Sequence, residues 1–215
     1  MKYYEQLFEL LFVGGLLQPG GSYLDEKRSP IYILKDDPEY DGVKGIVEVL
    51  KRVIQRYKYL QKPLEENFLP DLLGYLPKWE PKDRTKLAEA TALLIIDLQC
   101  GPKCLASLTK DHVVKDNVAL NFLTDFIKIY LSKQSMDSLA STIRRSGLKD
   151  ILGVFPQPVR DSKHLEAHFK KENLPGINEW YGKVMLSEIK EETIGSIHRM
   201  ISEEETNENV CIYLD

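Results

Sequence analysis

The chain has 215 residues, of which 43% are hydrophobic and 29% are charged, and its formal net charge is −4 at pH 7. This length fits one domain or two small ones and can bury a sizeable core. The charge balance gives no global electrostatic reason to expect nucleic acid or an anionic membrane as the main partner. No apolar run approaches the roughly 18 residues of a membrane helix. Glu5 and Glu9 interrupt the first apolar segment, so we expect no secretory signal and no membrane association.

The first predicted helix spans Tyr3 to Val13 and ends at Gly14-Gly15. Its spacing places three leucines on one face: Leu7, Leu10 and Leu11. Residues Ser22 to Tyr40 are predicted to form a long surface loop with one short extended piece. Loops of this length are uncommon in compact domains and are often functional.

The segment from Asp41 to Leu76 has the strongest helical pattern, and Asp41 is a suitable N-cap. Apolar residues at steps of three and four predict one buried face: Ile46, Leu50, Val53, Tyr57 and Leu60. Pro63 stands where a second helix can begin, and Pro70 is expected to kink or divide that helix. The segment is therefore predicted to be a helical hairpin with an apolar inside.

The outer face of this hairpin is basic, with no acidic residue between Glu48 and Glu65. Its cations form a first basic cluster: Lys51, Arg52, Arg56, Lys58 and Lys62. A second basic cluster follows later in the chain: Arg144, Arg145 and Lys149. One interpretation is a surface for an acidic protein segment or for RNA phosphates. The other is an ordinary solvated helix face. Tyr57 and Tyr59 stand beside the first cluster and could stack bases, but the spacing places Tyr57 on the buried face.

Further helical segments follow with short breaks between them. They are Pro81–Cys100, Lys103–Leu108, Val113–Leu131, Ser135–Arg145, Leu148–Leu152, Asp161–Lys171 and a segment from Ile177 to about Ile201. With about ten helices and little strand, the chain is predicted to be all-α. Successive helical pairs of about 35–45 residues are close to the period of HEAT repeats. We therefore predict a HEAT/middle-domain-like stack of antiparallel helical pairs, although no clean internal repeat is present and an irregular bundle stays open.

We predict one domain over residues 1–201, which includes the loop 22–40, and an acidic tail or linker over residues 202–215. The three cysteines, Cys100, Cys104 and Cys211, are an odd set in a mid-sized chain. This argues against a disulfide framework and favours a reducing compartment. The predicted location is therefore the cytoplasm, with the nucleus as the other reducing compartment.

Residue patterns that could support chemistry are weak. His164 and His168 could face one metal ion, but in HLEAH the acid Glu166 lies midway, whereas zinc peptidase motifs place it next to a histidine. Cys100 and Cys104 would need two more ligands. Solvated histidines and buried thiols are the preferred interpretations.

The paired glycines also lack the sequence context of a phosphate loop, because no Lys-Ser/Thr follows them and no strand precedes them. No serine stands in a nucleophile elbow. An enzyme of unrecognised type would need a pocket that gathers His112, another histidine or a cysteine with an acid. We therefore predict a non-catalytic protein with no cofactor and no metal.

Three blocks of sequence carry a resemblance to a known family: LFELLFVGGLLQPGG (Leu7–Gly21), RYKYLQKPLEE (Arg56–Glu66) and STIRRSGLKDILGVFP (Ser141–Pro156). In order and spacing they resemble the eukaryotic translation initiation factor 5 mimic proteins, also called basic leucine zipper and W-two domain proteins. The resemblance covers about Lys2 to Ile201. The loop Ser22–Tyr40 and the region Ile177–Lys183 match less well, which indicates a divergent member.

The resemblance implies an N-terminal HEAT-like domain followed by a C-terminal HEAT domain like the one that ends factor 5. The present chain would then be the first part. It also implies translation regulation in competition with factor 5 in the preinitiation complex, with subunits of initiation factors 2 and 3, and the ribosome or RNA, as partners. The family binds factor 2 mainly through acidic–aromatic boxes of the C-terminal part. No such box is present here, so no binding residue is carried over. The leucine zipper of the family name has no leucine heptads to support it.

The sequence thus predicts a non-catalytic protein-interaction scaffold. Its candidate partner contacts are the eight cations of the two basic clusters. The alternative is an RNA-binding HEAT module of the translation machinery, similar to the middle domain of initiation factor 4G, in which the same cations touch phosphates.

Overall fold

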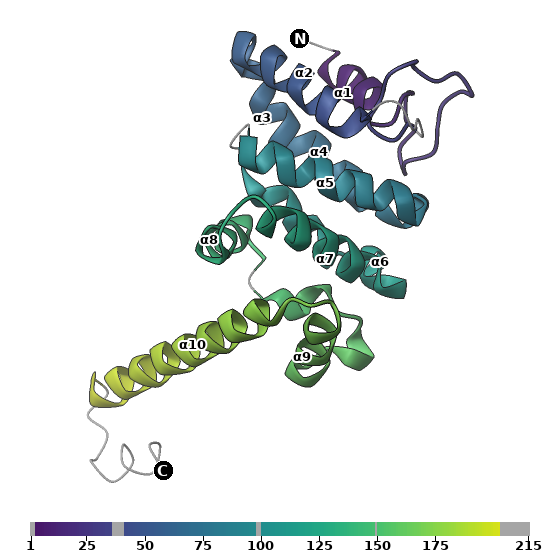
Figure 1. Cartoon of the computed structure of the whole chain (residues 1–215). Helices are drawn as coiled ribbons and strands as arrows, with labels where there is room; N and C mark the ends of the chain where they lie inside the picture. The colour runs from purple at the N-terminus through teal and green to yellow at the C-terminus, as the bar shows by residue number, and fades with distance from the viewer. Residues whose placement is uncertain (1–2, 36–40, 98–99, 149, 203–215) are drawn as a thin grey trace. The chain divides into compact units, whose positions relative to one another are not determined.

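The computed structural model describes residues 3–35, 41–97, 100–148 and 150–202 (Figure 1). The chain divides into two compact units, residues 1–165 and 166–215. Within the described ranges the regular elements are helices and helical turns, apart from an isolated β-bridge between Leu17 and Tyr23. This confirms the predicted all-α, HEAT-like class. The prediction of a single domain over residues 1–201 stays a prediction.

The first helix, α1 (Tyr4–Phe12), buries its aromatic residues rather than the predicted leucines. Phe8 and Phe12 are fully buried, with ring centroids 5.4 and 5.0 Å from that of Phe68. Leu7 and Leu10 are 37% and 41% exposed, so the predicted face was wrong. The larger aromatic side chains bury more area and determine how the helix is rotated against its neighbours.

Part of the following loop is packed rather than exposed. Ile33 and Leu34 are buried, and their backbone N–H groups donate to the carbonyls of Leu11 and Phe12 at 3.0 and 3.2 Å. Gly14 ends α1 with a φ of +78°, and the Tyr32 ring would lie 2.7 Å from a β-carbon at this position. Residues 36–40 of the predicted loop lie outside the described residues.

The hairpin begins with α2 (Gly42–Arg56), which Asp41 caps as predicted. The Asp41 carboxylate accepts a hydrogen bond from the Lys44 backbone N–H at 3.2 Å. The buried face is made by Val43, Ile46, Val47, Leu50 and Ile54.

The second half of the hairpin consists of η1 (Lys58–Leu60), α3 (Gln61–Pro63), a π-helical turn η2 (Leu64–Phe68) and α4 (Leu69–Gly74). Helical structure therefore begins before Pro63. Pro70 is the second residue of α4, directly after the π-helical turn, which confirms the predicted division. A proline has no N–H for the helical ladder, so the regular hydrogen-bond pattern is interrupted at this position.

After η3 (Leu76–Lys78), α5 (Pro81–Asp97) forms the centre of the first unit and packs against both α2 and α7 (Val118–Leu131). Figure 1 shows α2, α5 and α7 as successive layers. Almost every residue of α5 from Leu87 to Ile95 is buried. The alanines among them (Ala88, Ala90 and Ala92) allow neighbouring helices to approach closely.

The predicted single helix Val113–Leu131 is divided. After η4 (Pro102–Thr109), α6 (Asp111–Val114) is separated from α7 by η5 (Lys115–Asn117). Asp116 and Asn117 have φ angles of +55° and +58°. A left-handed backbone interrupts the helical hydrogen bonds, and Asp and Asn adopt it more readily than most residues.

The remaining elements of the first unit follow the prediction closely. Helix α8 (Met136–Ser146) is capped by Ser135, whose hydroxyl accepts from the Ser138 N–H at 3.3 Å, and it ends at Gly147 with a φ of +80°. Two short turns follow, η6 (Ile151–Val154) and η7 (Gln157–Val159).

Helix α9 (Ser162–Lys171) spans the boundary between the units, and α10 (Pro175–Ser202) belongs to the second unit. In the second unit Phe169, Ile177 and Tyr181 are buried. No helix in the described ranges is long and apolar enough to cross a bilayer.

Replacing Asp41 by Ala is expected to lower the free energy of unfolding by about 1 kcal/mol, because the α2 cap is lost. Guanidinium titration measures this difference. Asp41→Asn is the matched control, since the amide oxygen still accepts the hydrogen bond. An Ala variant as stable as the wild type would show that the cap contributes nothing.

The same pair of variants tests a pH dependence. The hydrogen bond from the Lys44 ammonium lowers the pKa of Asp41. A carboxylate with a depressed folded-state pKa adds stability above its unfolded pKa of about 3.9, and this is lost as the pH falls through the folded pKa. The stability difference between wild type and Asp41→Asn should therefore shrink in acid.

Candidate interaction surfaces

The first candidate surface lies where α2 ends, at the four consecutive residues Arg56 to Tyr59, named here the tyrosine turn. Tyr57 leaves the helical conformation, with φ −125° and ψ 67°. Helical spacing from Val53 therefore no longer decides where its ring lies. Tyr57 is 43% exposed, and the prediction that it is buried was wrong. Leu60 is buried, as predicted.

The side chains of the tyrosine turn are all exposed and lie close together. The ring centroids of Tyr57 and Tyr59 are 6.1 Å apart in an edge-to-face arrangement, and Tyr59 is 50% exposed. The guanidinium carbon of Arg56 lies 5.7 Å from the centre of the Tyr57 ring, within the range of a weak cation–π contact. The turn thus presents two aromatic rings beside two cations.

Three cations of the first basic cluster have acidic partners. Arg52 and Lys51 lie 3.2 and 4.0 Å from Glu48, and Lys62 lies 3.7 Å from Glu66. Each acid lies three or four residues from its cation, so about one helical turn brings the two side chains alongside. Arg56 and Lys58 have no carboxylate partner among the described residues. Exposed pairs of this kind contribute roughly 0–1 kcal/mol, so a ligand can displace them.

The second basic cluster lies in the last turn of α8. Arg144 and Arg145 are exposed, and neither has a carboxylate partner in the described part of the chain. Cations are favourable near a helix C-terminus. Lys149 lies outside the described residues.

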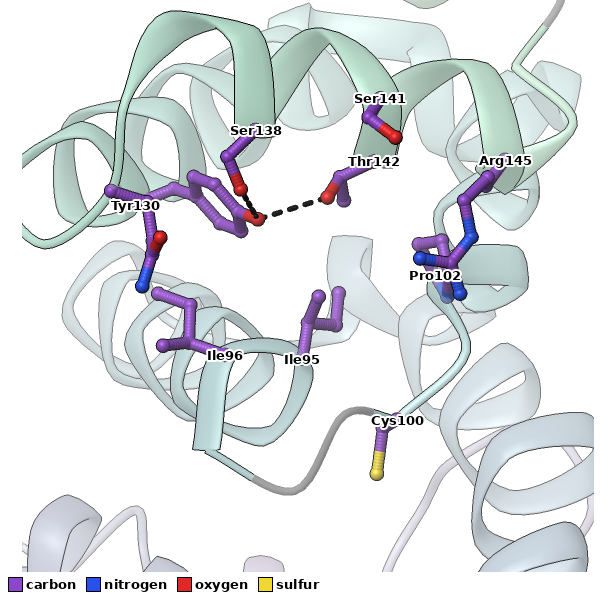
Figure 2. Close-up of a pocket in the computed structure, with 10 residues that line it drawn as sticks. Ile95, Ile96, Cys100, Pro102, Tyr130, Ser138, Ser141, Thr142 and Arg145 are labelled. Carbon is purple, nitrogen blue, oxygen red and sulfur yellow. Dashed lines mark hydrogen bonds between the residues drawn. The ribbon is translucent and has the colours of Figure 1, made fainter.

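A cavity of about 500 Å³ opens beside Arg145, between α5, α7 and α8 (Figure 2). The Tyr130 hydroxyl shares hydrogen bonds with the hydroxyls of Ser138 and Thr142, at 3.0 and 2.9 Å. The three hydroxyls supply three hydrogens for these two bonds, so one can be donated to a ligand. The lining residues are Ile95, Ile96, Cys100, Pro102, Tyr130, Gln134, Ser138, Ser141, Thr142 and Arg145, none of which is acidic.

The cysteines contribute no nucleophile to this cavity. Cys100 and Cys104 are both buried. Burial raises the pKa of both thiols, that of Cys104 to about 12, and the nearby Glu65 carboxylate raises them further. Both thiols are therefore protonated at neutral pH and unreactive. This confirms the buried-thiol interpretation.

The histidines hold local contacts. His164 Nδ1 lies 2.7 Å from an Asp161 carboxylate oxygen at the start of α9. His112 Nε2 lies 2.9 Å from the Gly74 carbonyl oxygen, and the His168 ring packs edge-on against Phe169. Within the described residues no three His, Cys, Asp or Glu side chains gather where they could hold a metal ion.

Two features of these surfaces were missed by sequence reasoning. The hydroxyl network joins α7 to α8. The four-residue step from Ser138 to Thr142 would have placed both hydroxyls on one helix face, but nothing in the sequence pairs that face with Tyr130. Tyr57 is exposed because the backbone leaves the helical conformation at this residue, and the spacing of apolar residues does not show where a helix ends.

A stack of helical layers is typical of HEAT-type domains. The family model of the 5MP1/2 HEAT domain matches residues 1–191, and the chain belongs to this family. This confirms the resemblance to the initiation factor 5 mimic proteins.

Several curated proteins are similar to the chain. Protein krasavietz of Drosophila melanogaster is 33% identical over 173 residues, which are 79% of this chain and 40% of that protein. The eIF5-mimic protein 1 of Gallus gallus is 27% identical over 186 residues, 83% of this chain and 44% of that protein. The eIF5-mimic protein 2 of Homo sapiens is 23% identical over 215 residues, 99% of this chain and 51% of that protein. The chain thus spans about half the length of the curated relatives it matches. No solved structure matches it.

In a Cys211→Ser variant, a thiol reagent at about pH 8 is expected to leave Cys100 and Cys104 unmodified in the folded protein. A thiol with a pKa of about 12 has fewer than about one in a thousand molecules ionised at this pH. Both thiols should react at once in denaturant, as absorbance of the released chromophore would record. Rapid modification of the folded variant would contradict the burial described above.

Proposed function

We propose that this chain is a non-catalytic interaction scaffold of a translation regulator that competes with initiation factor 5 in the preinitiation complex. The names of two similar proteins, eIF5-mimic protein 1 and 2, support the setting. Subunits of initiation factors 2 and 3 are the proposed partners, and the cytoplasm is the proposed location.

The observation that carries this proposal is the pair of exposed arginines on α8 beside the hydroxyl-lined cavity. Arg145 lines the cavity, and Arg144 precedes it in the same exposed turn. An arginine without an acidic neighbour keeps its fork of N–H donors available for a carboxylate, which it binds in a bidentate manner. An acidic partner segment could pair with Arg145 while its polar groups reach Ser141 and the hydroxyl network.

The helical stack supports this use because it holds the surface in place. Tyr130 and Thr142 are buried, and α8 packs against α7 and η4. A binding surface that is already ordered loses little entropy when a partner docks. Complementary charge then raises the association rate and excludes partners of the wrong sign.

The test is a pull-down from ribonuclease-treated cell extract with this chain as bait. The double variant Arg144→Glu/Arg145→Glu should recover initiation-factor subunits at least about tenfold less well, because the charge reversal repels an acidic segment. The matched control is Lys110→Glu/Lys115→Glu, which has the same charge change at two exposed positions that flank α6. Equal melting temperatures would confirm that all variants are folded.

Three outcomes are informative. Loss of recovery with the α8 variant and retention with the control supports the α8 surface. Equal loss with both variants would mean that only net charge matters, which contradicts a defined surface. Undiminished recovery with the α8 variant would exclude the two arginines as partner contacts.

A further inference from the structure

We propose that the tyrosine turn binds single-stranded RNA, with Tyr57 and Tyr59 stacking on bases while Arg56 and Lys58 contact phosphates. This goes beyond the protein scaffold proposed above. The choice of RNA rather than DNA rests on the proposed function in translation, but the binding chemistry rests on the turn alone.

The exposed rings are the first part of the argument. Tyrosine is amphipathic, and its ring is usually buried with only the hydroxyl in water. Here two neighbouring rings are 43% and 50% exposed at one place. The two rings contact each other edge to face, and both remain partly open to solvent. Aromatic faces in a basic setting are the common platform for unpaired bases, because every base has a π-face.

The second part is that the backbone of the turn is itself held in place. The Tyr57 N–H donates to the Val53 carbonyl at 2.8 Å, and the Leu60 N–H donates to the Tyr57 carbonyl at 2.9 Å. The buried Leu60 side chain anchors the turn to the core. A turn whose backbone is already held in place loses less entropy when a ligand docks on it.

The third part is the arrangement of charge. Arg56 and Lys58 alternate with the two tyrosines along the chain, so each ring has a cation next to it. Neither cation has a carboxylate partner in the described ranges. Arg52 and Lys62 flank the turn in exposed pairs that phosphates can displace. An acidic peptide would use the cations but not the rings, whereas a nucleotide uses both.

The measurement is fluorescence anisotropy of the purified chain with a short, fluorescein-labelled oligouridylate over a series of salt concentrations. Tyr57→Leu/Tyr59→Leu keeps every charge and removes the stacking faces. Its affinity should fall about tenfold or more, with an unchanged salt dependence. Arg56→Gln/Lys58→Gln should reduce the slope of log K against log salt by about 1.4, as expected for two phosphate contacts on a single strand.

The control is Lys110→Gln/Lys115→Gln, which removes the same charge from exposed positions outside both surfaces and should leave RNA affinity within about twofold of the wild type. All four substituted positions of the turn are exposed, so the variants should fold, and melting curves check this. A self-complementary RNA duplex should bind more weakly than the oligouridylate, because paired bases cannot reach the rings.

Wild-type affinity of the tyrosine variant, or equal loss in the Lys110→Gln/Lys115→Gln control, would overturn the proposal. Equal binding of the duplex would also overturn it, since that would indicate attraction to phosphates alone. If the oligouridylate does not bind, and the tyrosine variant instead loses proteins captured from ribonuclease-treated extract, the turn is a protein contact. Because the anisotropy assay uses the purified chain, its failure leaves the pull-down test of the proposed function unaffected.

Discussion

The burial of α5 is the constraint on which the rest of the first unit depends. Its residues from Leu87 to Ile95 are covered by α2 on one side and α7 on the other. Each large side chain buried in this way stabilises the fold by roughly 1.5–3 kcal/mol. The buried alanines of α5 leave room for the neighbouring helices to come close, and its buried leucines and isoleucine fill the space between the helices.

Both candidate surfaces are positioned by this central helix. The end of α5 supplies Ile95 and Ile96 to the cavity beside α8, and α2, which ends in the tyrosine turn, packs against its length. Both surfaces therefore belong to one compact unit. A net charge of −4 does not prevent local attraction, because an exposed charge acts mainly within a Debye length of about 8–10 Å.

Much of the fold could be predicted from the sequence, because local signals agree with it. Asp41, Ser135 and Gly147 mark helix ends through their own backbone chemistry, and the structure places the ends there. The errors arose where tertiary packing or a backbone change outweighed periodicity. In α1, Phe8 and Phe12 are buried in place of the leucines that the spacing predicted. The positive φ angles of Asp116 and Asn117 divide a segment that was predicted to be one helix.

The candidate surfaces were predictable in part. Arg144 and Arg145 stand out as adjacent charges in the sequence, and the structure leaves them exposed. Three cations of the first basic cluster pair with nearby acids: Lys51 and Arg52 with Glu48, and Lys62 with Glu66. These pairs depend on how far the side chains reach along the helix, and the number of charges in the sequence does not give this. The hydroxyl network of the cavity joins Tyr130 of α7 to Ser138 and Thr142 of α8, and the sequence does not show that these two helix faces are in contact.

Site-specific photo-crosslinking tests the central claim, that defined cationic surfaces of this helical stack contact the translation machinery. A photoreactive amino acid would replace Ser141, which lines the cavity beside Arg145, in one variant and Lys115, outside both surfaces, in another, and each chain would be irradiated in cell extract. The account predicts crosslinks from position 141 to initiation-factor subunits and none of these from position 115. The same products from both positions, or none from position 141, would contradict it.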